Sequence, residues 1–285
     1  MPEGDNIFRA ARTLNRALAG NSVTGFRSNY ALLTRFNDDT PLTGRTVERV
    51  EARGKWLLMH FSGDAILVTH MLMSGSWHIY RHGERWQLPA AMMRMVVETK
   101  DFVAVGFNVP VAEMHTAQSL ARDPRIPGLA SDVLGGGFDA NAAVKSLLSY
   151  PDAELGEVLL MQTVLAGVGN VFKSEICFVT GLNPIRKVAT LTREQAAQVV
   201  STAQKLLESN VLEDSGDRIV TYRGRRRRTT HRSDPGESLW VYGRSGEPCR
   251  RCGEAIRRRL QGADARGTYW CPRCQPMPGA RDVDG

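Results

Sequence analysis

The chain of 285 residues is too long for one compact core and suits two modest domains with a small additional module. Its content of 42% hydrophobic and 7% aromatic residues excludes global disorder, and no apolar run approaches the roughly 18–20 residues that span a bilayer. The formal charge of +7 gathers in residues 186–285, which hold 20 Lys and Arg against 12 Asp and Glu, whereas residues 1–185 hold 17 against 18. This uneven surplus favours an anionic partner, nucleic acid before others; the alternative is a charge balance that serves solubility.

The opening residues, Met1 to Asp5, are acidic and lack the basic and apolar regions of a secretory signal. We therefore expect a cytoplasmic protein, associated with the nucleoid if its source is bacterial, that makes no membrane contact. In that compartment thiols stay reduced, so disulfides are disfavoured.

The N-terminal half predicts one helix followed by short strands. Apolar residues recur at helical spacing and stop before Gly20, at Ile7, Ala10, Ala11, Leu14, Ala17 and Leu18. Residues 65–70 follow a turn and form a β-type run, and residues 95–99 and 102–105 flank a two-residue turn typical of a hairpin. Many short strands at close spacing indicate a sandwich or barrel packed against the first helix, and hence an α+β fold.

The second half predicts helices. The segment 124–137 is rich in Pro and Gly, and we place a domain boundary there. Asp139 caps a helix that runs to Leu148, and a second helix is expected over residues 155–163. A third starts near Asn170. A fourth begins at the capping-box residues Thr192 and Gln195 and ends near residue 210.

Four of the five cysteines form two short pairs, Cys249-x2-Cys252 and Cys271-x2-Cys274, separated by 18 residues. In a cytoplasmic protein this spacing indicates one tetrahedral zinc ion, because each pair offers two thiolates to the same metal. Four thiolates leave no open position for water or substrate, so the ion is expected to be structural. Cys177 lies alone in an apolar stretch and is expected to be a buried, inert thiol.

The sequence Pro2-Glu3 would place a secondary amine at the N-terminus once Met1 is removed. An α-amine has a pKa of about 7.7–8.0, so part of it is neutral and nucleophilic near pH 7. Attack on a sugar C1′ would give an iminium ion, and Glu3 could move protons there. Many proteins begin Pro-Glu, however, and these two residues alone favour no function.

Four further segments change this interpretation, although each is individually weak: a Lys is usually on the surface, a Met is usually in the core, and Gly-x-Gly-Asn is usually a turn. Lys55 precedes an apolar strand, the loop 70–77 is apolar and ends in Ser-Gly, residues 165–170 form a glycine-rich turn, and Arg266 leads into the second cysteine pair. Together, in this order, they resemble the formamidopyrimidine-DNA glycosylase/endonuclease VIII family of base-excision repair enzymes. The resemblance extends from residue 2 to Cys274, and Gly4 favours the endonuclease VIII branch.

The resemblance implies a role for each matched residue. Pro2 would be the Schiff-base nucleophile, Glu3 the acid/base that helps to open the deoxyribose, and Lys55 an auxiliary catalytic group. His70, Asn170 and Arg266 match positions that bind phosphates, and Glu175 matches a family carboxylate. Met73 lies where the family inserts an apolar side chain into the duplex, which offsets part of the cost of extruding a base.

The resemblance also implies four parts: a catalytic β-sandwich domain (1–128), a helix–two-turn–helix domain with an Arg-rich loop (129–235), a four-cysteine zinc-finger hairpin (236–275) and a tail (276–285) expected to be disordered. The loop contains Arg225 to Arg228. We interpret this arginine run as a solvated segment held near DNA by its charge, with a specific contact as the alternative.

Three features depart from the family pattern. The family usually has Glu where this chain has Asn6, and the loop Leu72-Met73-Ser74 resembles the formamidopyrimidine branch and not the Gln-Leu-Tyr of endonuclease VIII. The segment 106–110 lacks the Arg and Phe with which the formamidopyrimidine branch fills the gap left by the flipped base. The residues expected to insert into the duplex and to fill the gap therefore combine features of the two branches. We call this set of residues the wedge.

We predict a monomeric DNA glycosylase and abasic-site lyase that excises oxidised bases, mainly pyrimidines, from damaged double-stranded DNA through a Pro2 Schiff base and β,δ-elimination. One alternative is a non-catalytic damaged-DNA-binding protein on the same scaffold, which Asn6 and the mixed wedge would suit. A more distant one is a zinc-ribbon module of the transcription machinery, which has no use for an N-terminal proline.

Overall fold

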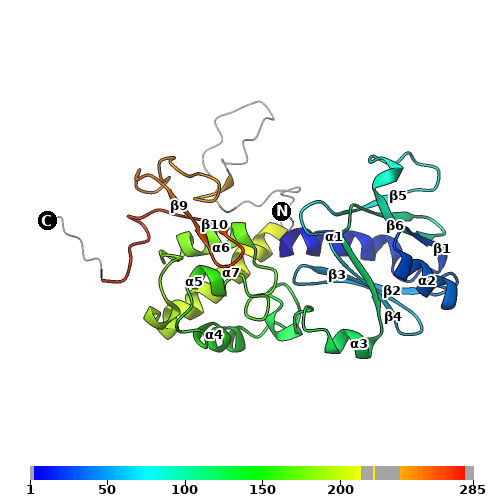
Figure 1. Ribbon diagram of the computed structural model, residues 1–285, viewed down its shortest axis with the longest axis horizontal. Helices are drawn as coiled ribbons and strands as arrows, with labels where there is room; N and C mark the ends of the chain where they lie inside the picture. Colours follow the sequence, from blue (N-terminus) through cyan, green and yellow to red (C-terminus); the bar gives the residue numbers. More distant parts are fainter. Residues whose placement is uncertain (1–2, 213–220, 222–237, 280–285) are drawn as a thin grey trace. The chain divides into compact units, whose positions relative to one another are not determined.

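The computed structural model describes residues 3–212, 221 and 238–279, and the chain divides into two compact units, residues 1–127 and 128–285 (Figure 1). Pro2, the arginine run 225–228 and the last residues of the predicted tail lie outside the described residues. Within the described part, no helix is both long enough and apolar enough to cross a membrane.

The first unit contains three α-helices and eight strands among its described residues. The helices are α1 (Gly4–Leu18), α2 (Ala31–Asp39) and α3 (Ala117–Arg122). The strands are β1 (Val23–Ser28), β2 (Val47–Arg53), β3 (Trp56–Phe61), β4 (Ala65–His70), β5 (Ser76–Tyr80), β6 (Met93–Thr99), β7 (Val103–Phe107) and β8 (Val111–His115). The predicted helix, the strand at 65–70 and the hairpin β6–β7 are confirmed.

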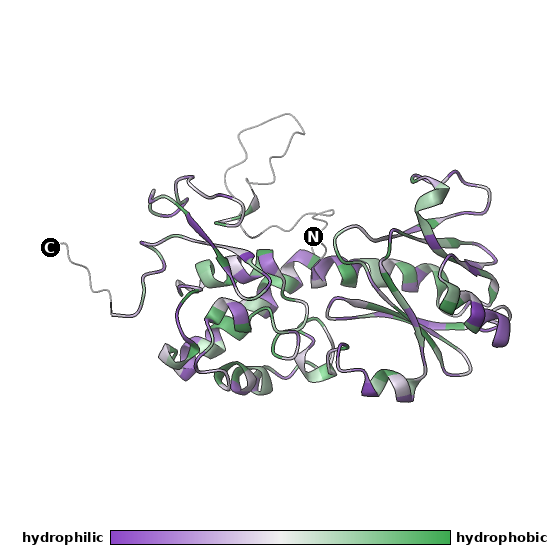
Figure 2. Ribbon diagram, viewed as in Figure 1, coloured by the Kyte–Doolittle hydropathy of each residue, from purple (hydrophilic) through white to green (hydrophobic). Residues whose placement is uncertain are grey.

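These strands form two antiparallel sheets, in the orders β1-β6-β7-β5 and β2-β3-β4-β8. One apolar core takes side chains from both sheets and from one face of α1, where Ile7, Ala11, Leu14 and Leu18 are buried. Figure 2 shows the matching pattern, with apolar segments along the strands and alternating apolar and polar bands on α1. The predicted β-sandwich with a packed helix is thus confirmed.

Glu51 on β2 anchors a charged cluster on the outer surface of the second sheet. Its carboxylate bonds to His60 Nε2 at 3.0 Å and to Arg53 at 3.1 Å. The hydrogen bond from His60, followed by smaller effects of the neighbouring arginines, lowers the pKa of Glu51 to about 2. The negative carboxylate therefore stabilises the fold.

Glu51→Gln is expected to destabilise the protein by about 1 kcal/mol at pH 7, since water screens a half-exposed ion pair. Because the folded-state pKa lies below the unfolded value of about 4.3, this contribution is present above that pH and is lost as the pH falls toward 2. Thermal melts should show a difference in melting temperature from wild type that is smaller at pH 3 than at pH 7. Glu48→Gln, at an exposed position of the same strand, is the control; a difference that persists unchanged at pH 3 would contradict the assignment.

The second unit is mainly helical. Its α-helices are α4 (Ala140–Leu148), α5 (Leu155–Val158), α6 (Asn170–Val179) and α7 (Arg193–Leu212). Asp139 Oδ1 accepts the N–H of Ala142, and Thr192 and Gln195 exchange the two hydrogen bonds of a capping box, as predicted. One apolar core joins α4 to α7.

The predicted helix over residues 155–163 is wrong, because α5 ends at Val158. After it the N–H groups of Leu160 and Met161 bond three residues back, in the tighter geometry of turns. The side chain of Gln162 then donates to the carbonyls of Leu160 and Val168, which removes it from a helical path. These residues form the two turns that separate α5 from α6.

The second unit also contains a two-stranded hairpin, β9 (Arg257–Gln261) and β10 (Arg266–Trp270). It contacts α6, and its small apolar cluster combines Phe178, Val241 and Ile256 with Cys249 and Cys271. The combination of a β-sandwich, a helical domain and a hairpin flanked by four clustered cysteines confirms the predicted α+β fold.

Candidate active site and nucleic-acid interface

The start of α1 carries two buried carboxyl groups. Glu3 and Asp5 are both fully enclosed, and the Glu3 carbonyl accepts the N–H groups of Asn6 and Ile7, which places Glu3 at the N-cap position of the helix. Burial raises the pKa of Asp5, although Arg9 acts in the opposite direction. Pro2, the predicted nucleophile, lies outside the described residues, but the peptide bond to Glu3 ties it to this enclosed carboxyl group.

Asp5 is a residue that the sequence analysis missed. Its Oδ1 atom is buried and has no hydrogen-bond partner among the described residues, while Oδ2 lies 3.4 Å from Arg9. Asn6, which departs from the family's usual Glu, accepts a 2.5 Å hydrogen bond from the same Arg9. In this chain, the carboxyl group in the first turn of α1 is that of Asp5, and the position of the family's usual Glu is occupied by the amide of Asn6.

Lys55 and His70 lie together at one end of the sheet β2-β3-β4-β8. Gly54 and Lys55 form the two-residue turn between β2 and β3, and Gly54 adopts φ = 60°, a backbone conformation that suits glycine. His70, the last residue of β4, pairs with Trp56 across the ladder, and the two rings make an edge contact at 4.8 Å. The positive charge of Lys55 is close enough to act on the His70 ring.

His70 is a neutral imidazole. Burial, and after it the charge of Lys55, lower its pKa to about 4. Its Nδ1 atom accepts the N–H of Leu72 at 3.1 Å, so the ring proton resides on Nε2. Such a ring offers an anion one N–H donor and no positive charge.

Acidification is therefore not expected to increase the contribution of His70 to DNA affinity. Between pH 8 and 5.5, His70→Ala should weaken binding to a duplex that contains a tetrahydrofuran abasic analogue by a constant factor, about three- to tenfold for one lost donor. An ordinary histidine would instead contribute more as the pH falls through about 6.5. Fluorescence anisotropy across this range measures the ratio, with His82→Ala as the control at an exposed histidine; a ratio that rises steadily below pH 6.5 would contradict the neutral assignment.

The loop after His70 presents Met73 to solvent, with 69% of the residue exposed. Gly75 closes the loop: its N–H bonds to the Met71 carbonyl, and a Cβ at this position would lie 2.7 Å from that oxygen and 3.0 Å from Val109. Leu72 adopts φ = 45°, which is uncommon for a leucine. A tight, strained turn therefore holds an apolar side chain outward, as a wedge requires.

The wedge loop belongs to a larger apolar edge. Among residues 3–127, the exposed large apolar side chains are those of Leu32, Leu72, Met73 and Met92. Ser76 and Met93, the first residues of β5 and β6, both pair with Phe107 at the end of β7, so the loops that precede them share one end of the sheet. The end of β1 reaches the same place, because Asn29 bonds to the carbonyls of Met93 and Arg94. Exposed apolar groups gathered in this way mark a binding surface.

In the second unit, the turn before α6 is held by Gln162. Its side chain accepts the N–H of Gly167 at 3.0 Å and donates to the carbonyl of Val168 at 3.1 Å. Gly167 has φ = 99°, which an L side chain rarely adopts. Gln162 was not predicted as a functional residue, because a lone Gln between apolar residues gives no signal of this role.

Asn170 and Arg266 are brought together at the start of α6 and β10. Asn170 Nδ2 donates to the carbonyl of Gly267 at 3.0 Å, and its buried Oδ1 has no partner among the described residues. Arg266, the neighbour of Gly267, keeps 43% of its side chain exposed and lies 3.5 Å from Asp264. A helix N-terminus beside an exposed guanidinium is a favourable place for a phosphate.

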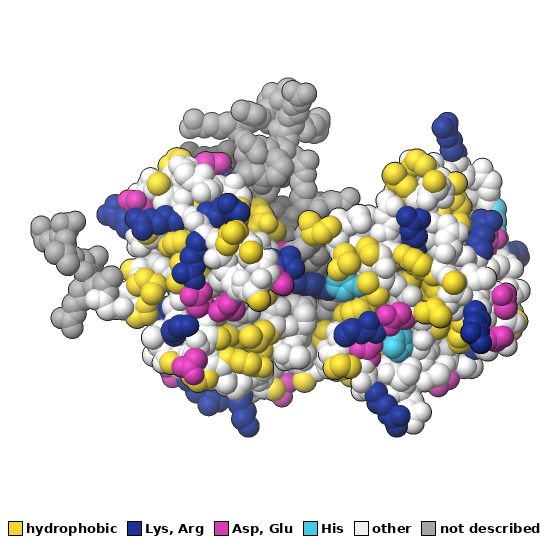
Figure 3. Space-filling model, viewed as in Figure 1, with side chains coloured by type: hydrophobic (Ala, Val, Ile, Leu, Met, Phe, Trp, Pro, Cys, Tyr) yellow, Lys and Arg dark blue, Asp and Glu magenta, His cyan; other side chains and the backbone are white. Residues whose placement is uncertain are grey.

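The hairpin also carries exposed arginines on β9, and Figure 3 shows Lys and Arg side chains over this part of the molecule. Arg259 is tied to Glu154, whereas Arg258 lies over the Tyr269 ring at 5.9 Å. The positive surplus seen in the sequence is thus partly located on the hairpin.

Glu175 is a fully buried carboxylate on α6. It accepts the N–H groups of Trp240, Val241 and Tyr242 at 2.8–3.0 Å, and also the hydroxyl of Thr221. Three consecutive backbone donors to one carboxylate hold the segment that leads into the cysteine hairpin. Because these hydrogen bonds satisfy a buried carboxylate, Glu175 stabilises the packing of residues 240–242 against α6.

The four cysteines of the two pairs cluster with all sulfur atoms within 4.8 Å of one another. Cys249 and Cys274 sulfurs are 3.9 Å apart and those of Cys252 and Cys271 are 3.4 Å apart, close to the roughly 3.8 Å edge of a tetrahedron with 2.3 Å Zn–S bonds. The N–H groups of Arg251 and Cys274 point at the sulfurs of Cys249 and Cys271. The donor set fits one structural zinc ion.

Cys252→Ser is expected to release the zinc and unfold the hairpin, because a structural zinc site supplies about 10–16 kcal/mol of apparent binding energy and the surrounding apolar cluster is small. Affinity for abasic duplex should fall at least about tenfold with the loss of the hairpin's phosphate contacts. Cys177→Ser is the control and should keep both its zinc and its affinity for the duplex. Cys177 lies outside the cysteine cluster, and burial raises the pKa of its thiol to about 12, so this thiol is inert in the wild type. Metal analysis gives the zinc content; one zinc per chain in Cys252→Ser with unchanged binding would contradict the assignment.

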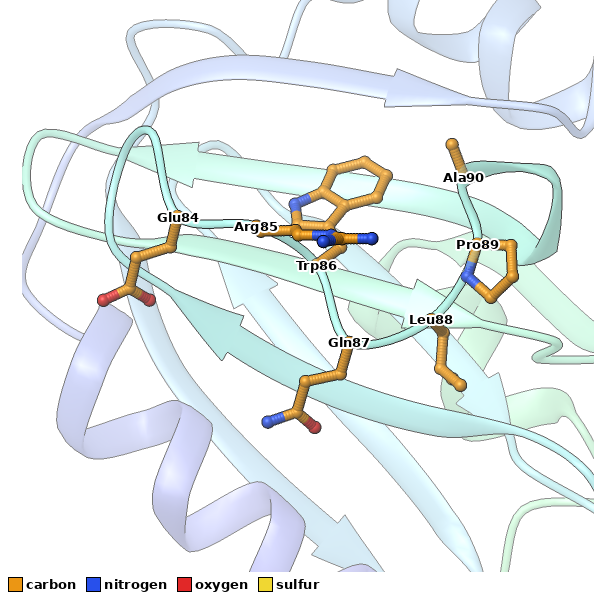
Figure 4. Close-up of a pocket in the computed structure, with 7 residues that line it drawn as sticks. All are labelled: Glu84, Arg85, Trp86, Gln87, Leu88, Pro89 and Ala90. Carbon is orange, nitrogen blue, oxygen red and sulfur yellow. The ribbon is translucent and has the colours of Figure 1, made fainter.

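Two other features, a surface hollow and a cluster of acidic and histidine side chains, do not belong to this site. A surface hollow is lined by residues 84–90 between β5 and β6 and contains none of the predicted site residues (Figure 4). The side chains of Glu113, His115 and Asp123 also cluster, but Arg125 bonds to both carboxylates at 2.5–3.1 Å. A guanidinium in this position makes the cluster an ion-pair network.

A β-sandwich with a carboxylate at its N-terminal helix, a helix–two-turn–helix domain and a four-cysteine hairpin together define the zinc-finger DNA glycosylases. Family models agree along the chain: the formamidopyrimidine-DNA glycosylase N-terminal domain matches residues 1–110, its H2TH domain residues 129–221, and the zinc finger found in FPG and IleRS residues 246–276.

Similar proteins cover nearly the whole length. A probable endonuclease 8 2 of Streptomyces coelicolor is 42% identical over 99% of this chain and 98% of its own. The DNA-(apurinic or apyrimidinic site) lyase Nei2 of Mycolicibacterium smegmatis is 37% identical over 96% and 99%. The formamidopyrimidine-DNA glycosylase of Lactococcus lactis, solved with abasic-site DNA, has the same fold at 22% identity, with a TM-score of 0.77 over 96% and 99%. The chain belongs to the formamidopyrimidine-DNA glycosylase/endonuclease VIII family, and its cysteine hairpin is a zinc finger of that family.

Proposed function

We propose that the protein is a bifunctional DNA glycosylase and abasic-site lyase of base excision repair. The observation that carries this proposal is the enclosed Glu3 carboxyl group directly after Pro2, in a chain that matches the family from end to end. The relatives named as endonuclease 8 and as an abasic-site lyase support the same reaction class. The catalytic residues fall in residues 1–128, and DNA-binding residues fall also in the helical part (129–235) and the finger (236–275).

The proposed reaction begins when the neutral amine of Pro2 attacks C1′ of the extruded nucleotide. The C1′–N bond to the base breaks, and the base leaves with a proton. The Pro2 nitrogen loses its proton, and its lone pair then forms the iminium ion as the C1′–O4′ bond breaks and O4′ takes up a proton. Loss of a C2′ proton then breaks the C3′–O bond, and loss of a C4′ proton breaks the C5′–O bond. Glu3 moves protons at the sugar oxygen, and Lys55 assists the elimination steps.

The remaining residues hold the DNA. His70 donates its Nε2–H to a phosphate as a neutral group, and Asn170 and Arg266 bind phosphates from the second unit. Met73 fills the space left by the extruded base, supported by the exposed apolar edge at that end of the sheet. Because these groups all belong to one chain, we propose that a monomer is sufficient and that it works in the cytoplasm, on the nucleoid if the source is bacterial.

The proposed substrates are oxidised bases, mainly pyrimidines, in double-stranded DNA. The names of the relatives favour this class, whereas the Met-containing loop resembles the branch that removes oxidised purines. A panel of oligonucleotides that carry thymine glycol, dihydrouracil, 8-oxoguanine or an abasic site decides between them. We expect nicking at the abasic site and at both pyrimidine lesions, with 8-oxoguanine processed more slowly.

The second candidate is a non-catalytic damaged-DNA-binding protein, which the replacement of the family's Glu by Asn6 favours. Such a protein would bind every duplex of the panel and nick none of them. Nicking of the abasic site by wild type, and its loss when Pro2 is changed, excludes this candidate.

A further inference from the structure

One face of α6 is bonded residue by residue to strand β10 of the zinc-finger hairpin. Asn170, Lys173 and Ser174 are spaced i, i+3 and i+4 and therefore share this face. Their partners are three consecutive residues of β10, bonded in order: the Gly267 carbonyl to Asn170 at 3.0 Å, the Thr268 hydroxyl to Lys173 at 2.7 Å and the Tyr269 N–H to Ser174 at 3.4 Å. This order fixes the register of the strand on the helix.

Lys173 is the unusual member, because its side chain is completely buried. Its amino group donates to the Thr268 hydroxyl, which donates in turn to Gln261 Oε1 at 2.7 Å. The amide nitrogen of Gln261 then donates to Glu154 at 2.8 Å and to the Pro184 carbonyl at 2.9 Å. A chain of satisfied polar groups thus runs from α6 through the hairpin to the start of α5.

The same chain reaches Arg266. Gln261 is the residue directly opposite Arg266 in the hairpin ladder. It is confined from the other side by Gly156 on α5, where an added Cβ would lie 2.5 Å from Gln261 Oε1. The backbone position of Arg266 is therefore fixed by the hydrogen bonds that link Lys173, through Thr268 and Gln261, to the start of α5.

We propose that Lys173 is a positioning residue for DNA binding, which sets Arg266 at a fixed distance from Asn170 so that both meet the phosphate backbone. The inference rests on the proposed function. A buried lysine adds little stability over a methionine of similar shape, since desolvation offsets its hydrogen bonds, and a purely structural role would be served by either residue. The polar chain supplies a defined strand register, which is what phosphate contacts need.

Lys173→Met is expected to raise KM for abasic duplex about five- to tenfold and to leave kcat within about twofold, as loss of one placed phosphate contact does. In salt titrations with a tetrahydrofuran-containing duplex, the slope of log affinity against log salt should become shallower by about one unit. Lys205→Met, which removes an exposed lysine from α7, is the matched control and should leave both values unchanged.

A double-mutant cycle shows whether Lys173 acts through Arg266. In an Arg266→Ala background, Lys173→Met should weaken DNA binding by less than a further factor of about two. The phosphate contact of Arg266, which Lys173 is proposed to position, is already absent from that background. An equal loss in both backgrounds, a loss confined to kcat, or wild-type binding by Lys173→Met would overturn the proposal.

A second pair of variants keeps the test independent of folding. Thr268→Val removes the hydroxyl that links Lys173 to Gln261 and should reproduce the KM effect, whereas Thr268→Ser retains the hydroxyl and should restore it. Wild-type KM in Thr268→Val would contradict the proposal. If wild type bound the tetrahydrofuran duplex but did not nick abasic DNA, the proposed function would fail, while the binding cycle would still decide the role of Lys173.

Discussion

Extending the chain by one residue ahead of Pro2 is expected to reduce base excision and strand nicking by at least about 10³-fold, because it converts the nucleophilic amine into an amide without a free lone pair. Binding to a tetrahydrofuran-containing duplex should stay within about threefold of wild type, since the phosphate contacts are made elsewhere. Single-turnover nicking of an abasic duplex measures the loss, and intact mass confirms which N-terminus is present.

Pro2→Gly is the companion variant. It keeps a free amine but removes the ring, so it should lose most excision while DNA binding is retained. A retained Met1 in the wild-type protein would block Pro2 in the same way, and the mass of the processed chain therefore belongs to the experiment. Full activity in the extended protein would exclude the terminal amine as nucleophile.

Glu3→Gln has the second largest expected effect. Gln keeps the shape of the enclosed side chain but cannot accept or release the proton that sugar opening requires, so base excision should fall about 10²- to 10⁴-fold. Release of thymine glycol under single-turnover conditions measures this step separately from DNA binding.

Glu48→Gln is the control for Glu3→Gln, because it makes the same chemical change at an exposed site on β2. A melting temperature of Glu3→Gln within a few degrees of wild type would show that the fold tolerates an amide at this enclosed position. Excision by Glu3→Gln at the wild-type rate would remove Glu3 from the proton-transfer steps and would place that role elsewhere.

Local signals predicted much of the fold. The apolar spacing from Ile7 to Leu18, the Asp139 cap and the Thr192–Gln195 capping box each depend on neighbours in the chain, and each is confirmed. The four cysteines were also predictable, because two short pairs converge on one ion whatever the path between them.

Features that depend on distant partners could not be predicted in this way. Helix α5 ends early because the Gln162 side chain bonds to the turn around Gly167, and apolar residues on both sides hide this from a periodicity argument. Lys173 has the sequence character of an exposed helical residue, yet it is buried against Thr268.

The candidate site shows the same division. The proximity of Lys55 and His70 follows from the pairing of β3 with β4, which no local pattern encodes. Asp5 stands beside the predicted Glu3, but its burial depends on how α1 packs into the sandwich. Residue types predicted the chemistry, whereas packing determined which groups are neutral, buried or exposed.

The covalent step can be captured directly. Wild type with a processed N-terminus is incubated with abasic duplex in the presence of borohydride, which reduces an iminium to a stable amine, and the adduct is digested and mapped by mass spectrometry. We expect a single protein–DNA adduct on the peptide that begins with Pro2. The absence of an adduct, or an adduct carried by Lys55, would contradict the proposed mechanism.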